Sequence, residues 1–180
     1  MRIITGTARG RKLSFPENDR IRPSTSLVKE SIFNIVQFDI EGRRVLDLFA
    51  GTGQLGLEAL SRGAAACDFV DTSRDALALV RKNLKSTELE GASVHQADAV
   101  NFLTGRTKYD LIFLDPPYDY EHLDKIIEKI VQVDILSING IMVCETDVNV
   151  TLPDVNAPYE KAREYRYGKV KITLYQRGAQ

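Results

Sequence analysis

The sequence predicts an α/β fold built on a mostly parallel sheet, and three observations support this prediction. Short apolar runs recur between stretches of helix-forming residues, an alternation typical of βαβ units. One run, residues 111–114, ends abruptly at an acidic residue followed by two prolines, as a buried strand can where it leaves a sheet. Near the C-terminus, polar and apolar residues alternate around Gly168 and Lys169, which predicts an antiparallel hairpin at the sheet edge.

Each element of the main domain is expected within a short range of the sequence. The predicted strands are 45–50, 67–71, 92–96, 111–115 and 140–145, followed by the hairpin strands 161–167 and 170–176. The predicted helices are 57–62, 73–85, a short one that ends at Leu103, and 121–131. Together they form a seven-stranded sheet with helices on both faces.

Residues 1–42 precede this domain and are expected to form a small hairpin and a helix. The hairpin covers residues 1–13, and the helix begins near Arg22, with Lys29 off its apolar face. This segment is too short for a core of its own, so it should pack on the main domain. The apolar face of the helix comprises Val28, Ile32, Ile35 and Val36.

The composition indicates a single domain with a sizeable core. The chain has 180 residues, of which 43% are hydrophobic. No stretch is long and apolar enough to span a membrane, and the first residues lack the apolar core of a signal peptide, so we expect a cytoplasmic protein. We also expect a monomer. Cys67, Cys144, His95 and His122 stand apart from one another without metal-ligand spacing, so no metal is expected.

Charge is distributed unevenly along the chain. Residues 1–29 contain seven Arg and Lys against two acids, a net charge of +5, so the rest of the chain carries −6 of the formal total of −1. A basic arm on an acidic body indicates that the arm contacts a polyanion. The alternative is a solvated terminus whose charges serve only solubility.

Residues 115–118 offer the chemistry of an amine-binding site. The prolines lack N–H groups, so this loop presents acceptors: the Asp115 carboxylate and the carbonyls of Pro116 and Pro117. Such acceptors can hold both hydrogens of an exocyclic amino group, while Tyr118 offers a ring on which a planar base can stack. The simpler interpretation is a tight turn after a strand.

Three glycines after the first strand are typical of a nucleotide-binding loop. Gly51, Gly53 and Gly56 match the dinucleotide fingerprint, and Asp71 follows at the spacing expected of an acid that binds a ribose diol. This pattern alone leaves both NAD and S-adenosylmethionine possible.

Three acidic positions favour S-adenosylmethionine. Asp47 could hold the amino group of a methionine moiety, Asp98 and Ala99 end a strand where an adenine amino group needs an acceptor, and Asp115 begins the amine-binding loop. The structural alternative for Asp47, Asp71 and Asp98 is that each caps the helix that follows it.

The order FAGTG, an acid, Asp-Ala and then DPPY resembles class I S-adenosylmethionine-dependent methyltransferases that act on exocyclic amines. It resembles more closely the RsmD-type 16S ribosomal RNA (guanine-N2) methyltransferases. The resemblance covers nearly the whole chain, through RIITGTARGRKL, RPSTSLVKESIFNIV, VLDLFAGTGQLGLEALSRGA, FLDPPY and LYQR. The chain departs from the usual pattern at Asp71, Ser26 and Lys29, where glutamate, aspartate and arginine are more common.

The resemblance implies a Rossmann-like class I methyltransferase fold, with an RNA-binding extension over residues 1–42 and the methyltransferase domain over 43–180. It also implies methyl transfer from S-adenosylmethionine to N2 of a guanine in 16S ribosomal RNA, within a small subunit or an assembly intermediate. The expected catalytic residues are Asp115, Pro116, Pro117 and Tyr118; the cofactor-binding residues are Asp47, Phe49, Gly51, Gly53, Asp71, Asp98 and Ala99; the RNA-binding residues are Arg9, Arg11, Lys12, Arg22 and Lys29.

Two other classes of function remain open from the sequence. An amino-methyltransferase acting on DNA adenine or on another RNA would use the same DPPY chemistry, although a DNA enzyme needs a sizeable target-recognition segment that this chain does not offer. A non-catalytic RNA-binding module would account for the basic arm but would leave Asp115 and its proline loop without a role.

Overall fold

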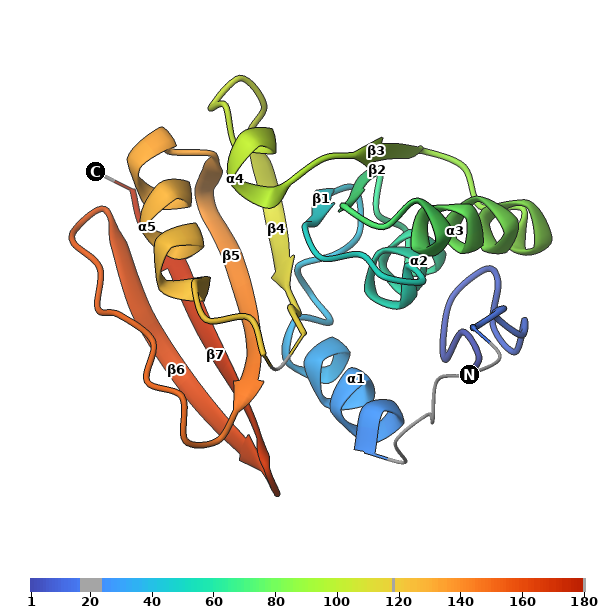
Figure 1. The fold of residues 1–180 in the computed structure, drawn as a ribbon, viewed down its shortest axis with the longest axis horizontal. Coiled ribbons are helices and arrows are strands. Elements are labelled where there is room, and N and C mark those ends of the chain that lie inside the picture. The colour runs from blue at the N-terminus through green and yellow to red at the C-terminus, as the bar shows by residue number, and fades with distance from the viewer. Residues whose placement is uncertain (17–23, 118, 180) are drawn as a thin grey trace.

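A computed structural model describes residues 1–16, 24–117 and 119–179. Within these residues the chain forms a seven-stranded sheet in the order β3-β2-β1-β4-β5-β7-β6 (Figure 1). The parallel strands are β3 (Ala92–Gln96), β2 (Ala66–Asp71), β1 (Arg44–Asp47), β4 (Tyr109–Leu114) and β5 (Leu136–Asp147), and the antiparallel ones are β7 (Val170–Arg177) and β6 (Tyr159–Tyr167). The predicted α/β class, strand number and C-terminal hairpin are therefore confirmed.

Helices cover both faces of the sheet and divide the core into two layers. The first layer contains buried residues of α1 (Ser24–Ile35), α2 (Gln54–Ser61) and α3 (Arg74–Thr87), and the second those of α4 (Ala99–Phe102) and α5 (Leu123–Val133). Because successive side chains of a strand point to opposite faces, Phe113 joins the first layer while Ile112 and Leu114 join the second. No helix among the described residues is long and apolar enough to cross a membrane.

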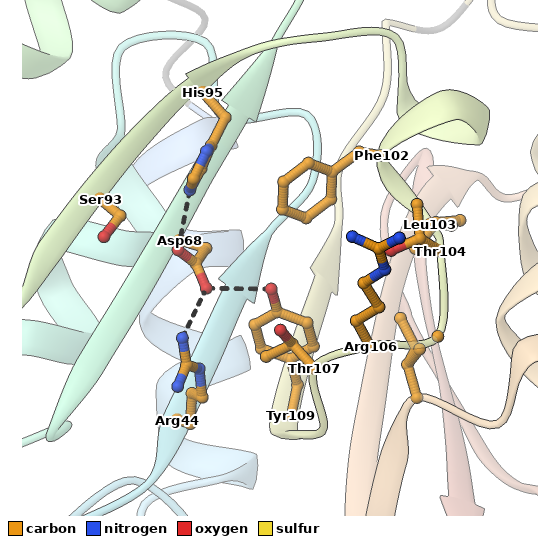
Figure 2. Close-up of a pocket in the computed structure, with 12 residues that line it drawn as sticks. Arg44, Asp68, Ser93, His95, Phe102, Leu103, Thr104, Arg106, Thr107 and Tyr109 are labelled. Carbon is orange, nitrogen blue, oxygen red and sulfur yellow. Dashed lines mark hydrogen bonds and ion pairs between the residues drawn. The ribbon is translucent and has the colours of Figure 1, made fainter.

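A polar cavity of about 340 Å³ lies beside the short helix α4 (Figure 2). Its centre is Asp68, which is 6% exposed. One carboxylate oxygen lies 2.9 Å from Nε2 of His95, and the other accepts a hydrogen bond from the Tyr109 hydroxyl and pairs with Arg44. This network is satisfied within the protein, so we assign it a structural role in joining β1, β2, β3 and β4.

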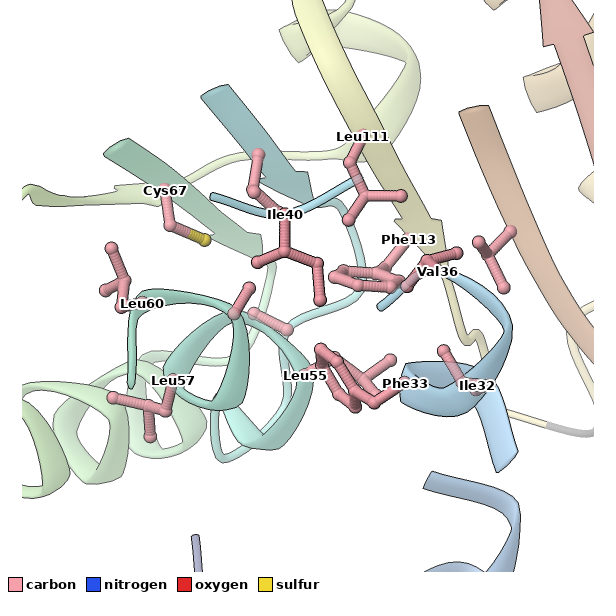
Figure 3. Packing of buried hydrophobic residues seen from close by; sticks show 14 of the residues in the cluster. Ile32, Phe33, Val36, Ile40, Leu55, Leu57, Leu60, Cys67, Leu111 and Phe113 are labelled. Atoms are coloured by element: carbon pink, nitrogen blue, oxygen red, sulfur yellow. The ribbon is translucent and has the colours of Figure 1, made fainter. Parts of the chain in front are cut away.

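Helix α1 packs beside α2 against the central strands (Figure 3). The rings of Phe33 and Phe113 lie 5.6 Å apart. Val28, Ile32 and Val36 are buried as predicted, but Ile35 is only half-buried, and Phe33 and Lys29 are buried instead. The buried face of this helix is therefore rotated about the helix axis, away from Ile35 and toward Lys29 and Phe33, relative to the predicted face.

The N-terminal residues pack against α2, as expected, but with less regular structure than a hairpin. A single antiparallel bridge joins Arg2 to Lys12. The backbone N–H groups of Ile4 and Thr5 donate to the carboxylate of Glu58, at 2.8 and 2.9 Å. Gly6 packs directly against the backbone of Ser61. A Cβ at position 6 would lie 1.7 Å from the carbonyl oxygen of Ser61, so no larger residue fits at this position.

Candidate active site

A cavity of about 440 Å³ opens at the carboxyl ends of the parallel strands, which is where open α/β sheets bind ligands. Its walls come from the loops after β1, β2, β3 and β4 and from the end of β5. The volume is in the range of small-molecule sites. The described lining residues include every predicted cofactor-binding residue except Gly53: Asp47, Phe49, Gly51, Asp71, Asp98 and Ala99.

The glycine loop needs its glycines for backbone conformation and for close packing. Gly51 and Gly53 have φ values of +51° and +81°, which side chains disfavour. Gly53 caps α2, and a Cβ on Gly56 would lie 2.3 Å from the ring of Phe69. The loop and α2 therefore sit against β2 at a distance that larger residues would prevent.

Two carboxylates hold this loop in place. Asp47, which is 1% exposed, accepts a hydrogen bond from the Gly56 N–H at 2.9 Å. Asp71 accepts from the N–H groups of Gly51 and Ser73, each at 2.8 Å. Each acid thus restrains the chain around the cavity while also lining it.

The acid after β3 acts as a helix cap. Asp98 accepts hydrogen bonds from the N–H groups of Val100 and Asn101, at 2.9 and 3.2 Å, and begins α4. The capping role that the sequence allowed for Asp98 is therefore present. Asp98 and the buried Ala99 also line the cavity, so capping does not exclude a contact with a ligand.

The loop after β4 brings Asp115, Pro116 and Pro117 to the same cavity. The Pro117 carbonyl accepts a hydrogen bond from the Tyr120 N–H at 2.9 Å, which leaves Pro116 as the better candidate for a ligand acceptor. Tyr118 lies outside the described residues. Sequence reasoning missed Tyr120, which lines the cavity with its ring 5.0 Å from that of Phe49 in an edge-to-face arrangement.

Sequence reasoning also missed an acid at the end of β5. Glu145 lines the cavity and is half-buried. It ends the apolar run 140–145, in the same way that Asp115 follows its own run, so an available sequence signal was overlooked.

The cavity is strongly acidic. Its described lining contains no Lys, Arg or His, but it contains the carboxylates of Asp47, Asp71, Asp98, Asp115 and Glu145. This charge suits a cationic ligand such as a sulfonium with its ammonium group, and it disfavours the pyrophosphate of NAD. The residues present therefore fit S-adenosylmethionine.

Burial disfavours ionisation of Asp47, Asp115 and Glu145. Burial raises the pKa of Asp47 to about 7, and the charges of Asp115 and Asp71 act in the same direction, while the Gly56 N–H opposes them. The side chain of Asp115 has a large accessible surface, because it faces the open cavity. The cavity walls around it nevertheless displace bulk water, and this desolvation raises the pKa of Asp115 to about 6. A bound cation would favour the ionised forms.

The basic residues assigned to RNA differ in their surroundings. Arg9 and Lys12 are exposed, and Arg11 is half-exposed in an ion pair with Glu88 at 3.0 Å. Arg22 lies outside the described residues. The assignment of Lys29 is wrong, because its side chain is 3% exposed and its ammonium lies 3.0 Å from the buried carboxylate of Glu58.

The chain matches the family model described as Conserved hypothetical protein 95 over residues 1–176. It is 40% identical to the Bacillus subtilis protein YlbH, with 98% of this chain and 99% of that protein covered. It is 37% identical to "Ribosomal RNA small subunit methyltransferase D" of Escherichia coli strain K12, with 100% of this chain and 91% of that protein covered.

The solved structures agree with this relationship. The Escherichia coli protein yhhF matches with a TM-score of 0.88 and 35% identity, over 100% of this chain and 99% of that one. The fold, the motifs and the length matched all agree with the resemblance seen in the sequence. The chain therefore belongs to the RsmD-type family of S-adenosylmethionine-dependent methyltransferases.

Proposed function

We propose that this protein transfers a methyl group from S-adenosylmethionine to the exocyclic N2 amine of a guanine in 16S ribosomal RNA. The observation that carries this proposal is the position of the Asp115-Pro116-Pro117 loop at the mouth of an acidic cavity. The name of the Escherichia coli relative supports ribosomal RNA of the small subunit as the substrate. The proposed substrate form is a small subunit or an assembly intermediate, bound by a monomer of this chain.

The cavity residues would hold the cofactor with its cationic end toward the acids. The ribose hydroxyls would donate to Asp71, and the adenine amino group would lie beside Asp98 and Ala99, between the loops that follow β2 and β3. Asp47 is placed to attract the ammonium group, directly or through water. When bound, S-adenosylmethionine supplies an electrophilic methyl carbon on a positively charged sulfur.

The loop after β4 would position the amine that receives the methyl group. The N2 lone pair of guanine is delocalised into the ring, so the amine must be oriented and made more electron-rich. Asp115 would accept one N2 hydrogen and the Pro116 carbonyl the other, and the carboxylate would stabilise positive charge that develops on nitrogen. As the new N–C bond forms, the methyl carbon would leave the sulfur, which keeps the C–S electron pair, and N2 would give one proton to Asp115 or to water.

A base must leave its stack to reach this loop, which suits a loop nucleotide in RNA. Tyr118 is proposed to stack on it. Residues 1–42 would bind the neighbouring phosphates through Arg9, Arg11, Lys12 and Arg22, while residues 43–180 carry out the chemistry. The exposed positions of Arg9 and Lys12 support this role for the arm.

Methyl transfer from tritiated S-adenosylmethionine tests the proposal directly. Purified protein is incubated in parallel with small ribosomal subunits, free 16S RNA and duplex DNA, all from cells that lack the enzyme, and the labelled nucleic acid is digested to nucleosides. We expect label in N2-methylguanosine from one or both RNA samples and none from DNA. Label in N6-methyladenine would identify a different amino-methyltransferase, and RNA binding without transfer would identify a non-catalytic module.

A further inference from the structure

Glu145 stands beside Asp115 at the carboxyl edge of the sheet. Strands β4 and β5 are parallel, and their register pairs Phe113 with Val143 and Leu114 with Cys144. Asp115, the first residue after β4, therefore follows the last pair at the same level as Glu145 on β5. Phe113 and Val143 belong to the same core layer, and side chains two residues further along a strand point to the same face. Both carboxylates line the cavity, which places two acceptors next to each other.

The described surroundings of Glu145 contain no partner for its charge. The side chain is half-buried, and among the described residues it forms neither an ion pair nor a hydrogen bond. Burial and the charge of Asp115 raise the pKa of Glu145 to about 8, so a hydrogen bond from a ligand donor is needed to hold the carboxylate ionised near neutral pH. A partly desolvated carboxylate without a donor is unfavourable in the free protein, so a donor from a ligand would be strongly favoured.

Two adjacent acceptors match two adjacent donors on the Watson–Crick edge of guanine. The N1–H group lies next to the 2-amino group, and both donate hydrogen bonds. Adenine presents its amino group beside N1 as an acceptor, which a carboxylate would repel. The pair therefore distinguishes the two purines, whereas the Asp115 loop alone could hold the amino group of either.

We infer that Glu145 selects guanine by accepting a hydrogen bond from N1–H while Asp115 holds the N2 amine. This inference rests on the proposed function and adds a base-reading residue to it. Glu145 would then contribute to the choice of base rather than to cofactor binding.

The test uses the RNA substrate identified above with 2-aminopurine in place of the target guanine. This base keeps the 2-amino group but has an unprotonated N1 that accepts a hydrogen bond. 2-Aminopurine also lacks O6, but this difference affects every enzyme variant equally. The quantity compared between wild type and Glu145→Gln is therefore kcat/KM with guanine divided by kcat/KM with 2-aminopurine. The glutamine keeps the shape and can donate from its amide to the unprotonated N1.

We expect Glu145→Gln to lower the preference for guanine over 2-aminopurine by about tenfold or more, the scale of one hydrogen-bonded base contact. The melting temperature should stay the same or rise, because glutamine replaces a partly desolvated carboxylate that lacks a donor, and S-adenosylmethionine affinity should fall less than in Asp71→Ala. Glu145→Asp should keep the preference at reduced kcat/KM, because it keeps the charge and shortens the reach. The matched control is Glu160→Gln, which changes an exposed glutamate on the edge strand β6.

An unchanged base preference in a folded Glu145→Gln enzyme would overturn the inference. So would a fall in S-adenosylmethionine affinity in place of the change in preference, because Glu145 would then belong to the cofactor site. Failure of the proposed function is recognised separately. In that case the wild-type enzyme yields no N2-methylguanosine from any RNA, and the inference fails with it.

Discussion

The ammonium of Lys29 lies 3.0 Å from a carboxylate oxygen of Glu58, and both side chains are almost completely buried. Glu58 also accepts from the N–H groups of Ile4 and Thr5 and from Arg62. One acid on α2 thus joins the N-terminal residues to α1. Burial lowers the pKa of Lys29, and the charge of Glu58 opposes that effect. This lysine therefore supports the position of the arm and is not available to a phosphate.

Replacing Lys29 by methionine should destabilise the fold by about 3 kcal/mol, because it leaves part of the Glu58 charge buried without its partner. Urea denaturation measures this difference. The control is Lys125→Met on α5, where the lysine is exposed and the change should stay within about 0.5 kcal/mol. Equal stabilities of Lys29→Met and wild type would show that the pair contributes nothing to holding α1.

Asp115→Ala should retain S-adenosylmethionine binding and reduce methyl transfer by at least about 100-fold, the scale expected when a transition-state electrostatic contact is removed. Calorimetry measures cofactor affinity, and single-turnover transfer measures the chemical step. Asp115→Asn separates charge from shape, because it keeps an acceptor oxygen without the negative charge. Near-normal transfer by the alanine variant would contradict the role assigned to Asp115.

The raised pKa of Asp115 predicts how the reaction depends on pH. The ionised carboxylate is the active form, so transfer should fall as the pH decreases through about 6 and should be retained above it. The pKa of Glu145 is raised further, to about 8, so Glu145 is already neutral where Asp115 titrates, and Glu145→Gln should leave the fall near pH 6 in place. A pH profile of kcat/KM for the two enzymes checks both expectations, and a fall at markedly lower pH in the variant would show that the charge of Glu145 raises the pKa of Asp115.

Asp71→Ala should weaken S-adenosylmethionine binding by about tenfold or more, since it removes a charged acceptor for the ribose hydroxyls. The structure adds a second reason, because the same carboxylate holds the Gly51 and Ser73 N–H groups around the cavity. Calorimetry measures the affinity, with NAD as the competing ligand. Unchanged affinity would remove Asp71 from the site, and tighter binding of NAD would overturn the choice of cofactor.

The sequence predicted the main domain well because its signals are local. Both ends of β3 were predicted correctly, at residues 92 and 96. The Asp115 loop and the glycine loop line the same cavity, as expected, because the carboxyl ends of parallel strands lie at one edge of the sheet. Strand β1 ends at Asp47, earlier than expected, because the chain turns toward the glycine loop. These features follow from periodicity and turn chemistry within a few residues.

The residues that sequence reasoning misjudged depend on distant partners. Lys29 shares a helix face with Phe33 and Val36, yet a buried lysine is tolerable only because Glu58 meets it from α2. The position of Glu145 beside Asp115 depends on the register between β4 and β5. Neither a long-range ion pair nor a strand register can be obtained from local patterns in one sequence.

The basic arm provides the last prediction, because its charges can be changed without touching the cavity. Arg9, Arg11 and Lys12 lie at the surface of the N-terminal segment and are not among the described residues that line the cavity. Replacing all three by glutamine should weaken RNA binding and leave S-adenosylmethionine affinity intact. Removing one phosphate-binding charge should reduce the slope of log affinity against log salt by roughly 0.7 to 0.9.

Arg11 needs a separate comparison within this set, since its guanidinium also pairs with Glu88 and donates to the Ser86 carbonyl. If that pairing is its main role, Arg11→Gln lowers the melting temperature slightly and leaves the salt slope unchanged, whereas Arg9→Gln and Lys12→Gln reduce the slope. Filter binding of 16S RNA across a salt series measures each variant. A triple variant with wild-type affinity and salt dependence would identify the arm as a solvated terminus, even if the methyltransferase activity remains.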